Sequence, residues 1–365
     1  MNGRGVCYDV GRVMWGQSWR PAFSLEEAAR ELQIIRDDLH CSAVRICGED
    51  LNRVMAAGEL ALEAGLEVWL SPELWDREAK ETLEYVVEAA GRAEALHRRR
   101  PGRVVLSLGS ELTLFMAGIV EGRTFFERLS HPRFWQAVRA GEHNPPLNAY
   151  LGRAAERARR VFHGRLTYAS VPLETVDWRP FDIVGVDLYR DARVRDRFEG
   201  IAADYLRHNR PVAVLESGCC TYHGAADAGG RGFEILDTSG GRESAPPRLK
   251  GPYQRDEAEQ AREVAAILES LERVGVDAAF VMTFIQPLNP TSAEPLYDLD
   301  MASFSLVKSF GGRLGPLGEA HPDAPWEREA RGLTYPDMPW EPKEAFWAVA
   351  RAYGGAAATS SGGGD

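Results

Sequence analysis

Two glutamates that end short apolar runs are the residues of this sequence best placed to do chemistry. The run LSLGSE ends at Glu111, and the run PVAVLE ends at Glu216. A carboxylate at the end of a buried strand loses hydration, so its pKa shifts unless a partner compensates. Two such groups facing each other could serve as acid and base, or as acid and nucleophile. The alternative interpretation is that each forms an ordinary ion pair at the rim of a sheet.

Eight short apolar segments predict the strands that would position these glutamates. The segments are continuous apolar runs, which is typical of parallel strands covered on both faces. They lie at residues 5–11, 42–48, 66–71, 103–111, 165–170, 181–189, 211–216 and 276–284. The pattern predicts a helix after each strand, with a short connection before the sixth, and a capping box of Ser24 and Glu27 begins the first helix.

These elements predict an α/β protein that folds as a single (β/α)8 TIM barrel. Residues 1–354 would form the barrel, and the low-complexity residues 355–365 would be a disordered tail. Long βα loops are expected after strands four, seven and eight, at 112–145, 217–253 and 286–341. Loops of this kind lie on the face where the strands end, so they would shape a pocket around the two glutamates.

The composition argues against several classes of protein. With 365 residues, 44% of them hydrophobic and 27% charged, the chain can bury a large core. A net charge of −11, with no basic run beyond residues 98–100, argues against a nucleic-acid partner. No secretory signal is evident, and no apolar run approaches the ~20 residues that cross a membrane. We therefore expect a cytoplasmic protein without a membrane partner, whose oligomeric state the sequence leaves open.

Cofactor and metal chemistry finds little support in the sequence. Motifs for binding phosphate or dinucleotides, for a serine nucleophile and for zinc proteases are absent. The five cysteines, including the adjacent Cys219 and Cys220, lack metal-site spacing, although this pair should lie near Glu216. His223 follows the seventh strand, but a loop histidine is the simpler interpretation. No cofactor and no metal are predicted.

The positions of the two glutamates on their strands suggest that they act together in one reaction. Glu111 and Glu216 end strands four and seven, about three βα units apart, where a closed barrel could make them face each other. Glycoside cleavage uses two carboxyl groups, about 5–5.5 Å apart in retaining enzymes and about 6.5–9.5 Å apart in inverting ones. On these residues the chain resembles the clan A glycoside hydrolases, (β/α)8 enzymes with an acid/base on strand four and a nucleophile on strand seven.

The resemblance assigns roles to four residues. It implies that Glu111 is the general acid/base and Glu216 the nucleophile, with Arg45 and Tyr189 as supporting residues beside the nucleophile. A guanidinium and a phenol donor would keep Glu216 ionised. The negative charge of Glu216 would in turn raise the pKa of Glu111. Alternatively, Arg45 could pair with a rim carboxylate such as Asp9 or Glu49, and Tyr189 could be rim packing.

Three positions depart from the clan's pattern. Ser110 stands where an asparagine usually precedes the acid/base, and Asp187 replaces a histidine on strand six. Phe284 stands where a tryptophan usually ends strand eight. These changes keep the pair of carboxylates and alter the shell that would hold the sugar.

Further candidates for substrate binding lie near the predicted strand ends. Carboxylates of Asp9, Glu73 and Asp187 could accept hydrogen bonds from sugar hydroxyls, or could pair with rim arginines. Loop tryptophans could stack on sugar rings or pack their loops onto the barrel. The substrate-binding set expected from these positions and the departures above is Asp9, Trp15, Glu73, Trp75, Ser110, Asp187 and Phe284, with Trp19 and Trp178 as further loop candidates and Trp69 in the core.

The sequence thus predicts a retaining glycoside hydrolase that acts on a small soluble glycoside. One alternative is a barrel of the same descent with non-hydrolytic activity, such as transglycosylation or a biosynthetic rearrangement. Another alternative is a carbohydrate-binding or phage-defence protein without turnover. The chain resembles actinobacterial proteins labelled "abortive infection", and this resemblance implies a bacterial source.

Overall fold

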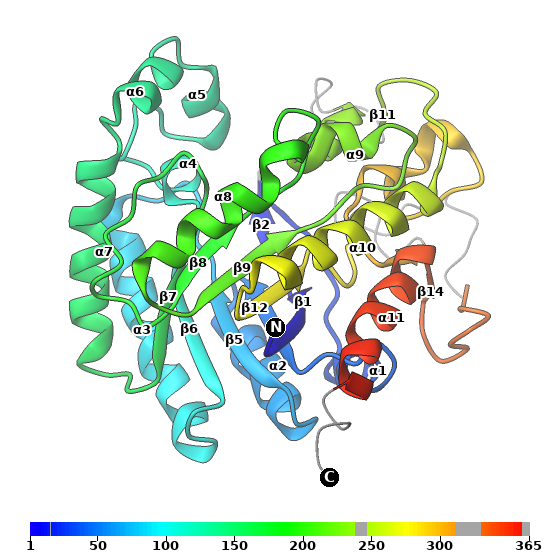
Figure 1. Cartoon of the computed structure of the whole chain (residues 1–365), viewed down its shortest axis with the longest axis horizontal. Helices are drawn as coiled ribbons and strands as arrows, with labels where there is room; N and C mark the ends of the chain where they lie inside the picture. The colour runs from blue at the N-terminus through cyan, green and yellow to red at the C-terminus, as the bar shows by residue number, and fades with distance from the viewer. Residues whose placement is uncertain (15, 238–246, 311–329, 360–365) are drawn as a thin grey trace.

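A closed barrel of eight parallel strands forms the centre of the computed structural model, which describes residues 1–14, 16–237, 247–310 and 330–359 (Figure 1). Each strand pairs with two neighbours, and the last strand, β12, closes the ring against β1. In ring order from β1 the strands are β1 (Gly3–Asp9), β4 (Ala43–Gly48), β5 (Glu67–Pro72), β6 (Val104–Ser110), β7 (Arg165–Ser170), β8 (Val184–Asp187), β9 (Val212–Ser217) and β12 (Ala278–Val281). The predicted (β/α)8 TIM barrel is confirmed.

The strands are buried along almost their whole length, as their continuous apolar runs predict. Residues of β4, β6, β8, β9 and β12 are buried at every position. Side chains from one face of each strand fill the barrel, and those from the other face pack against the helices. Each of the eight runs coincides with one barrel strand, although β8 and β12 are shorter than their runs.

The longer helices surround the barrel and cover its outer face (Figure 1). Helix α1 begins with the expected capping box, because the Ser24 side chain accepts a hydrogen bond from the Glu27 backbone N–H. Gly65 follows α2 with a φ of +88°, a left-handed conformation that glycine adopts without strain. These outer helices are α1 (Leu25–Asp37), α2 (Leu51–Glu63), α3 (Ala79–Arg99), α7 (Asn144–Arg159), α8 (Phe198–Asp204), α10 (Glu257–Val274) and α11 (Glu344–Thr359).

The chain between β7 and β8 forms the short connection that was expected before the sixth strand. No helix lies in this fully described stretch, residues 171–183. There the buried side chains of Trp178 and Phe181 pack with ring centroids 5.6 Å apart and cover the barrel instead. Trp178 is therefore a packing residue, as the simpler interpretation held. One feature differs from the expected elements: helix α11 runs to Thr359, beyond the predicted start of a disordered tail at 355. Residues 360–365 lie outside the described chain.

Most of the short elements lie in the loops that follow the barrel strands, whereas the 3-10 helix Tyr205–His208 leads from α8 into β9. The insertion after β6 folds into short helices, two of which form a lobe that stands above the barrel, at the upper left of Figure 1. None of the described helices has both the length and the apolar character needed to span a bilayer. The short elements are α4 (Leu112–Phe115), α5 (Phe125–Ser130), α6 (Phe134–Ala140), α9 (Ala225–Ala228), the 3-10 helices Arg195–Arg197, Tyr205–His208, Gly229–Ile235, Pro295–Tyr297 and Leu299–Ala302, and the two-stranded pairs β2 (Val13–Met14) with β3 (Gln17–Ser18), β10 (Leu236–Asp237) with β11 (Arg248–Leu249), and β13 (Val307–Ser309) with β14 (Trp340–Pro342).

Candidate active site

Glu216 lies at the floor of a pocket, where three side chains from other strands hold its carboxylate. Arg45 on β4 donates from Nη1 to Oε1 at 2.9 Å, and Tyr189 beyond β8 donates its hydroxyl to Oε2 at 3.2 Å. Both contacts match the expected surroundings of the residue. Arg45 also forms ion pairs with Glu73 and Asp187, rather than with Asp9 or Glu49.

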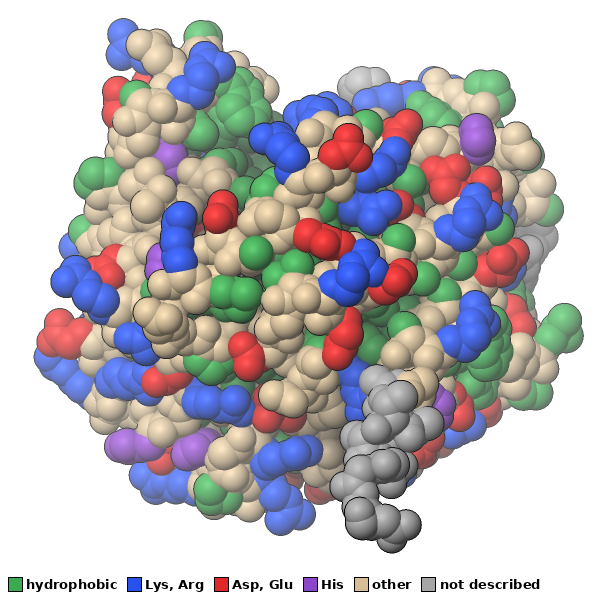
Figure 2. Space-filling view, in the orientation of Figure 1, with side chains coloured by type: hydrophobic (Ala, Val, Ile, Leu, Met, Phe, Trp, Pro, Cys, Tyr) green, Lys and Arg blue, Asp and Glu red, His purple; other side chains and the backbone are tan. Residues whose placement is uncertain are grey.

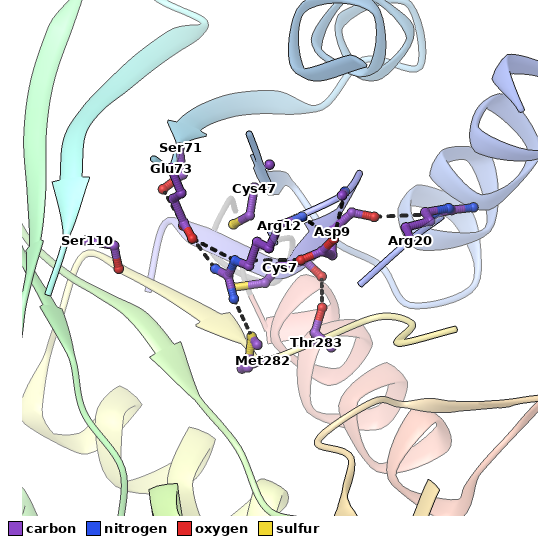
Figure 3. A network of polar contacts seen from close by, with 12 residues as sticks. Cys7, Asp9, Arg12, Arg20, Cys47, Ser71, Glu73, Ser110, Met282 and Thr283 are labelled. Atoms are coloured by element: carbon purple, nitrogen blue, oxygen red, sulfur yellow. Dashed lines mark hydrogen bonds and ion pairs between the residues drawn. The ribbon is translucent and has the colours of Figure 1, made fainter. Parts of the chain in front are cut away.

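A second guanidinium contacts Glu216, and sequence reasoning missed it. Arg12 lies three residues beyond β1 and donates from Nη2 to Glu216 Oε1 at 2.5 Å. Its Nε lies 2.8 Å from Glu73 Oε2, and its Nη1 lies 3.6 Å from the sulfur of Met282. Figure 3 shows Arg12 reaching from the first βα loop between Glu73 and Met282. Its position just past a strand end, in the run DVGR, was the available signal.

The turn that presents Arg12 depends on Asp9. The Asp9 carboxylate accepts hydrogen bonds from the backbone N–H groups of Gly11 at 2.8 Å and Arg12 at 3.1 Å. Burial raises the pKa of Asp9 to about 6. Asp9 is not among the residues that line the pocket, and its contact with a substrate stays a prediction. Both hydrogen bonds that shape the loop go to Oδ1 of its carboxylate.

The surroundings of Glu216 favour its ionised form. Burial raises the pKa of the carboxyl, but the positive charges of Arg12 and Arg45 oppose it. Hydrogen bonds from Arg12 and Tyr189 act in the same direction as the charges, and the pKa of Glu216 lies below its ordinary value. A carboxylate that stays ionised while buried is suited to attack an electrophilic carbon.

Glu111 lies on the opposite side of the floor, and its backbone conformation, rather than side-chain partners, positions it. It follows β6 directly in the left-handed conformation, with φ 48° and ψ 44°, and its backbone N–H donates to Ala169 O at 2.8 Å. The pairing of β6 with β7 shifts register between Ser107 and Ser110, a β-bulge that turns the chain just before Glu111. Among the described residues, no side chain or backbone group forms a hydrogen bond with its carboxyl group.

The pKa of Glu111 moves in the opposite direction from that of Glu216. Burial, followed by the negative charges of Asp187 and Glu216, raises the pKa of Glu111 well above its ordinary value. One carboxylate oxygen each from Glu111, Asp187 and Glu216 all lie within 4.8 Å of one another. The protonated form of Glu111 is therefore favoured, whereas the ionised form of Glu216 is favoured beside it.

Asp187 and Ser110 form a polar layer at the floor. Ser110 Oγ donates to Asp187 Oδ2 at 3.1 Å and accepts from Arg45 Nη2 at 3.4 Å. Burial, followed by the charge of Glu216, raises the pKa of Asp187 well above its ordinary value. Ser110 lines the pocket, whereas Asp187 does not. The carboxylate of Asp187 contacts Ser110 and Arg45, and its direct contact with a substrate stays a prediction.

The pocket above this floor opens to solvent, and its space together with the adjoining open solvent is about 840 Å³. Of the predicted binding residues, Glu73, Trp75 and Ser110 line it, together with Trp19. Trp15 lies outside the described residues. The full lining consists of Arg12, Met14, Trp19, Glu73, Trp75, Ser110, Glu111, Phe115, Tyr189, Glu216, Gly230, Phe233, Leu236, Met282, Gln286, Leu288, Asn289, Ala302 and Phe304.

The prediction that Phe284 binds substrate also needs correction. Its side chain is fully buried between Tyr8 and Trp340, with ring centroids at 6.2 and 5.3 Å, and it does not line the pocket. Strand β12 ends at Val281, three residues earlier than the apolar run suggested, so Met282 faces the pocket instead. The apolar run continues past the strand because the chain enters the core beneath the final helix.

Other residues near the strand ends take no part in the pocket. Cys219 and Cys220 are buried, and neither lines the pocket, although they closely follow Glu216. His223 is largely exposed and lies near Asp256 and Glu259. Trp69 is buried as predicted, with its ring 5.0 Å from that of Phe280.

The carboxylates at the floor are poorly suited to a cation. Glu111, Asp187 and Glu216 could each offer an oxygen to one ion. Arg45 already pairs with both Asp187 and Glu216, and Arg12 pairs with Glu216. Two guanidinium groups repel a metal ion from the same site.

Comparisons with known proteins locate the fold among carbohydrate-cleaving enzymes. No protein-family model matches the sequence, and no curated protein does. A GH113 beta-1,4-mannanase has a similar structure with a TM-score of 0.57 and 14% identity, covering 97% of this chain and 99% of that chain. GH113 beta-mannanase AaManA from Alicyclobacillus acidocaldarius, in complex with ManMIm, has a TM-score of 0.55 and 15% identity over 97% of both chains.

A third similar structure is larger than this chain. Bacteroides uniformis beta-glucuronidase 2, covalently bound to cyclophellitol-6-carboxylate aziridine, has a TM-score of 0.51 and 16% identity. It matches 84% of this chain and 33% of its own length. At these identities the likeness concerns the fold alone, an eight-stranded parallel barrel.

Proposed function

We propose that this protein is a retaining glycoside hydrolase that acts on a small glycoside, with Glu216 as nucleophile and Glu111 as acid/base. The observation that carries the proposal is the pair itself: two carboxyl groups with oxygens within 4.8 Å of each other and with pKa values displaced in opposite directions. This separation favours the retaining geometry of about 5–5.5 Å over the inverting one, in which a water must fit between the groups.

In the first step, an oxygen of Glu216 attacks the anomeric carbon of the bound sugar. The bond from that carbon to the leaving oxygen breaks, and Glu111 gives its proton to that oxygen, so an alcohol departs. The product is an ester between the sugar and Glu216. Glu111 is then a carboxylate, and its pKa falls because the charge of Glu216 has been cancelled.

In the second step, a water molecule replaces the departed alcohol. Glu111 takes a proton from this water as the water oxygen attacks the anomeric carbon. The bond to Glu216 breaks, the sugar leaves with its original configuration, and both glutamates regain their starting protonation. Tyr189 and the two arginines hold the Glu216 carboxylate in place through both displacements.

Transfer of the sugar to another acceptor would use the same ester. The similar structures support cleavage by water, since their names describe a mannanase and a glucuronidase on the same barrel. We therefore propose that the reaction is hydrolysis and that the protein is soluble and cytoplasmic.

Covalent trapping tests the proposal. We would treat the protein with 2-deoxy-2-fluoro glycosyl fluorides of mannose, glucose and glucuronic acid in both anomeric forms, and map labelled peptides by mass spectrometry. The expected result is one added sugar on the peptide that contains Glu216, and no label on Glu216→Gln. The matched control is Glu49→Gln, which alters another glutamate directly after a barrel strand but outside the pocket, and it should label like the wild type. A label on any other carboxylate would contradict the assignment.

A further inference from the structure

The pocket has a charged floor and apolar walls, and the two come from different parts of the chain. The charged groups lie at or just past the ends of the barrel strands, as Arg12, Glu73, Glu111 and Glu216 do. The walls come from the loops after β1, β5, β6, β9 and β12. Their main members are Trp19, Trp75, Phe115, Phe233, Leu288 and Phe304.

The aromatic members of the walls are held in place by one another. Trp75 stacks on Phe115 with ring centroids 4.2 Å apart and an interplanar angle of 11°, and Trp19 meets Trp75 edge-on at 6.4 Å. On the other side, Phe304 lies 5.4 Å from the ring of Tyr189. Rings fixed by such contacts present a preformed apolar surface, which needs little ordering when a ligand binds. In Figure 2 the surface is notched between the α5–α6 lobe and the body, with hydrophobic side chains along the lobe's inner side.

The pocket lining includes two buried amide side chains. Gln286 and Asn289 are 8% and 3% exposed, and both line the pocket. Within the part of the chain that the structure describes, Gln286 Oε1, Asn289 Nδ2 and Trp75 Nε1 form no hydrogen bond. Buried polar atoms are nearly always hydrogen-bonded in folded proteins, so unpartnered ones that line a pocket point to a ligand. A sugar hydroxyl both donates and accepts, which suits an amide oxygen and an amide N–H.

Building on the function proposed above, we propose that the pocket selects a glycoside whose aglycone is a planar apolar group. The sugar lies on the charged floor, where Gln286 and Asn289 bind its hydroxyls, and the aglycone lies between the loop walls. A second sugar in the aglycone position would place several hydroxyls against Phe233, Leu288 and Phe304, which offer them no partners. An aromatic ring there would instead bury apolar surface on both faces.

Binding to a variant that cannot turn over separates this preference from the reactivity of the leaving group. With Glu216→Gln, we would measure the Kd of 4-nitrophenyl and methyl glycosides of the same sugar and anomer by calorimetry, and of the matching disaccharides. The expected result is at least about tenfold tighter binding of the 4-nitrophenyl glycoside than of either other ligand. Equal affinity for the methyl glycoside, or tighter binding of the disaccharide, would overturn the proposal.

Variants of the walls and of the amides should affect this ratio differently. In the Glu216→Gln background, Phe233→Ala and Leu288→Ala change half-buried wall residues and should reduce the preference for the 4-nitrophenyl glycoside several-fold. Phe126→Ala, an exposed phenylalanine outside the pocket, should leave it unchanged. Gln286→Met and Asn289→Leu should weaken both glycosides equally and keep the ratio. A wall variant that keeps the full ratio would contradict the assignment of the walls.

The outcome is distinguishable from failure of the proposed function. A protein that prefers 4-nitrophenyl glycosides but never forms a covalent ester contradicts the hydrolase proposal alone. A protein that forms the ester and hydrolyses glycosides but binds methyl and 4-nitrophenyl forms equally contradicts the aglycone proposal alone. Thermal unfolding of each variant, compared with Phe126→Ala, shows whether a lost preference follows from a lost fold.

Discussion

The two sides of the pocket floor treat the same chemical group in opposite ways. Around Glu216, strands β1, β4 and β8 lead to two guanidinium groups and a phenol that bind the carboxylate directly. Around Glu111, a β-bulge and a left-handed residue place the carboxyl group beside other acids, with no hydrogen bond from the described residues. Positively charged and hydrogen-bonding partners lower the pKa of Glu216, whereas burial and neighbouring negative charges raise the pKa of Glu111.

The largest expected effect comes from removing the partnered glutamate. Glu216→Gln keeps the shape of the side chain but cannot form an ester with the sugar. Turnover of any glycoside that the wild type cleaves should fall by more than about 10⁴-fold, beyond the usual range for loss of an acid/base. Steady-state assays with 4-nitrophenyl glycosides measure this fall, with Glu49→Gln as the control. Activity within tenfold of the wild type would show that the comparison assigns the wrong nucleophile.

Removing the unpartnered glutamate should have a smaller effect that depends on the leaving group. Glu111→Gln leaves Glu216 to attack without proton donation, and kcat/KM should fall by about 10²–10⁴-fold for methyl glycosides. The loss should be much smaller for 2,4-dinitrophenyl glycosides, whose leaving group needs no proton. A series of aryl glycosides of increasing leaving-group pKa measures the trend. An equal loss across the series would argue that Glu111 is not the acid.

Arg12→Met tests the comparison by removing one of the two guanidinium groups that bind the Glu216 carboxylate. Arg12 lowers the pKa of Glu216, so its removal should raise that pKa. Activity requires ionised Glu216 and is lost as the pH falls through its pKa, so the acid limb of kcat/KM should move to higher pH. At neutral pH we expect a loss of about tenfold to a hundredfold, from lost positioning of the carboxylate.

Arg12→Lys controls for charge in this experiment. It keeps a positive charge beside Glu216, and its acid limb should stay closer to that of the wild type. An acid limb at the same pH in Arg12→Met and the wild type would contradict the electrostatic role of Arg12.

The smallest effect is expected at Ser110. Ser110→Ala removes one hydrogen bond to Asp187 and one acceptor for Arg45. The free energy of unfolding should fall by about 0.5–1.5 kcal/mol, as for the loss of a typical buried hydrogen bond. Urea denaturation measures this change, and kcat/KM should stay within tenfold. A loss comparable with that of Glu111→Gln would show that Ser110 contacts the substrate in an essential way.

The sequence predicted the barrel and the position of the two strand-end glutamates for a clear physical reason. Buried parallel strands need continuous apolar runs, and a charged residue that ends such a run must lie at the strand end. Glu111 and Glu216 were found by this rule, whereas Arg45 and Tyr189 were expected from the resemblance to the clan A glycoside hydrolases. The same rule placed Phe284 at the end of the eighth strand. That position was wrong, because an apolar run can continue past the end of a strand into the core.

What the sequence could not show is how the loops close over the floor. Arg12 lies in a turn whose shape depends on Asp9, and neither periodicity nor spacing reveals where such a turn points a side chain. Gln286 and Asn289 lie in a long loop without a regular pattern. Residues of this kind are identified by three-dimensional contacts, here by partners for Arg12 and by missing partners for the amides.

The double pairing of Arg12 has a consequence for charge balance during turnover. When the proposed ester forms, Glu216 loses its negative charge, and a buried guanidinium bound to it alone would be left without a counterion. Arg12 keeps Glu73, and Arg45 keeps Glu73 and Asp187. The site can therefore neutralise and restore its central carboxylate in each cycle without stranding a cation in a medium of low polarity.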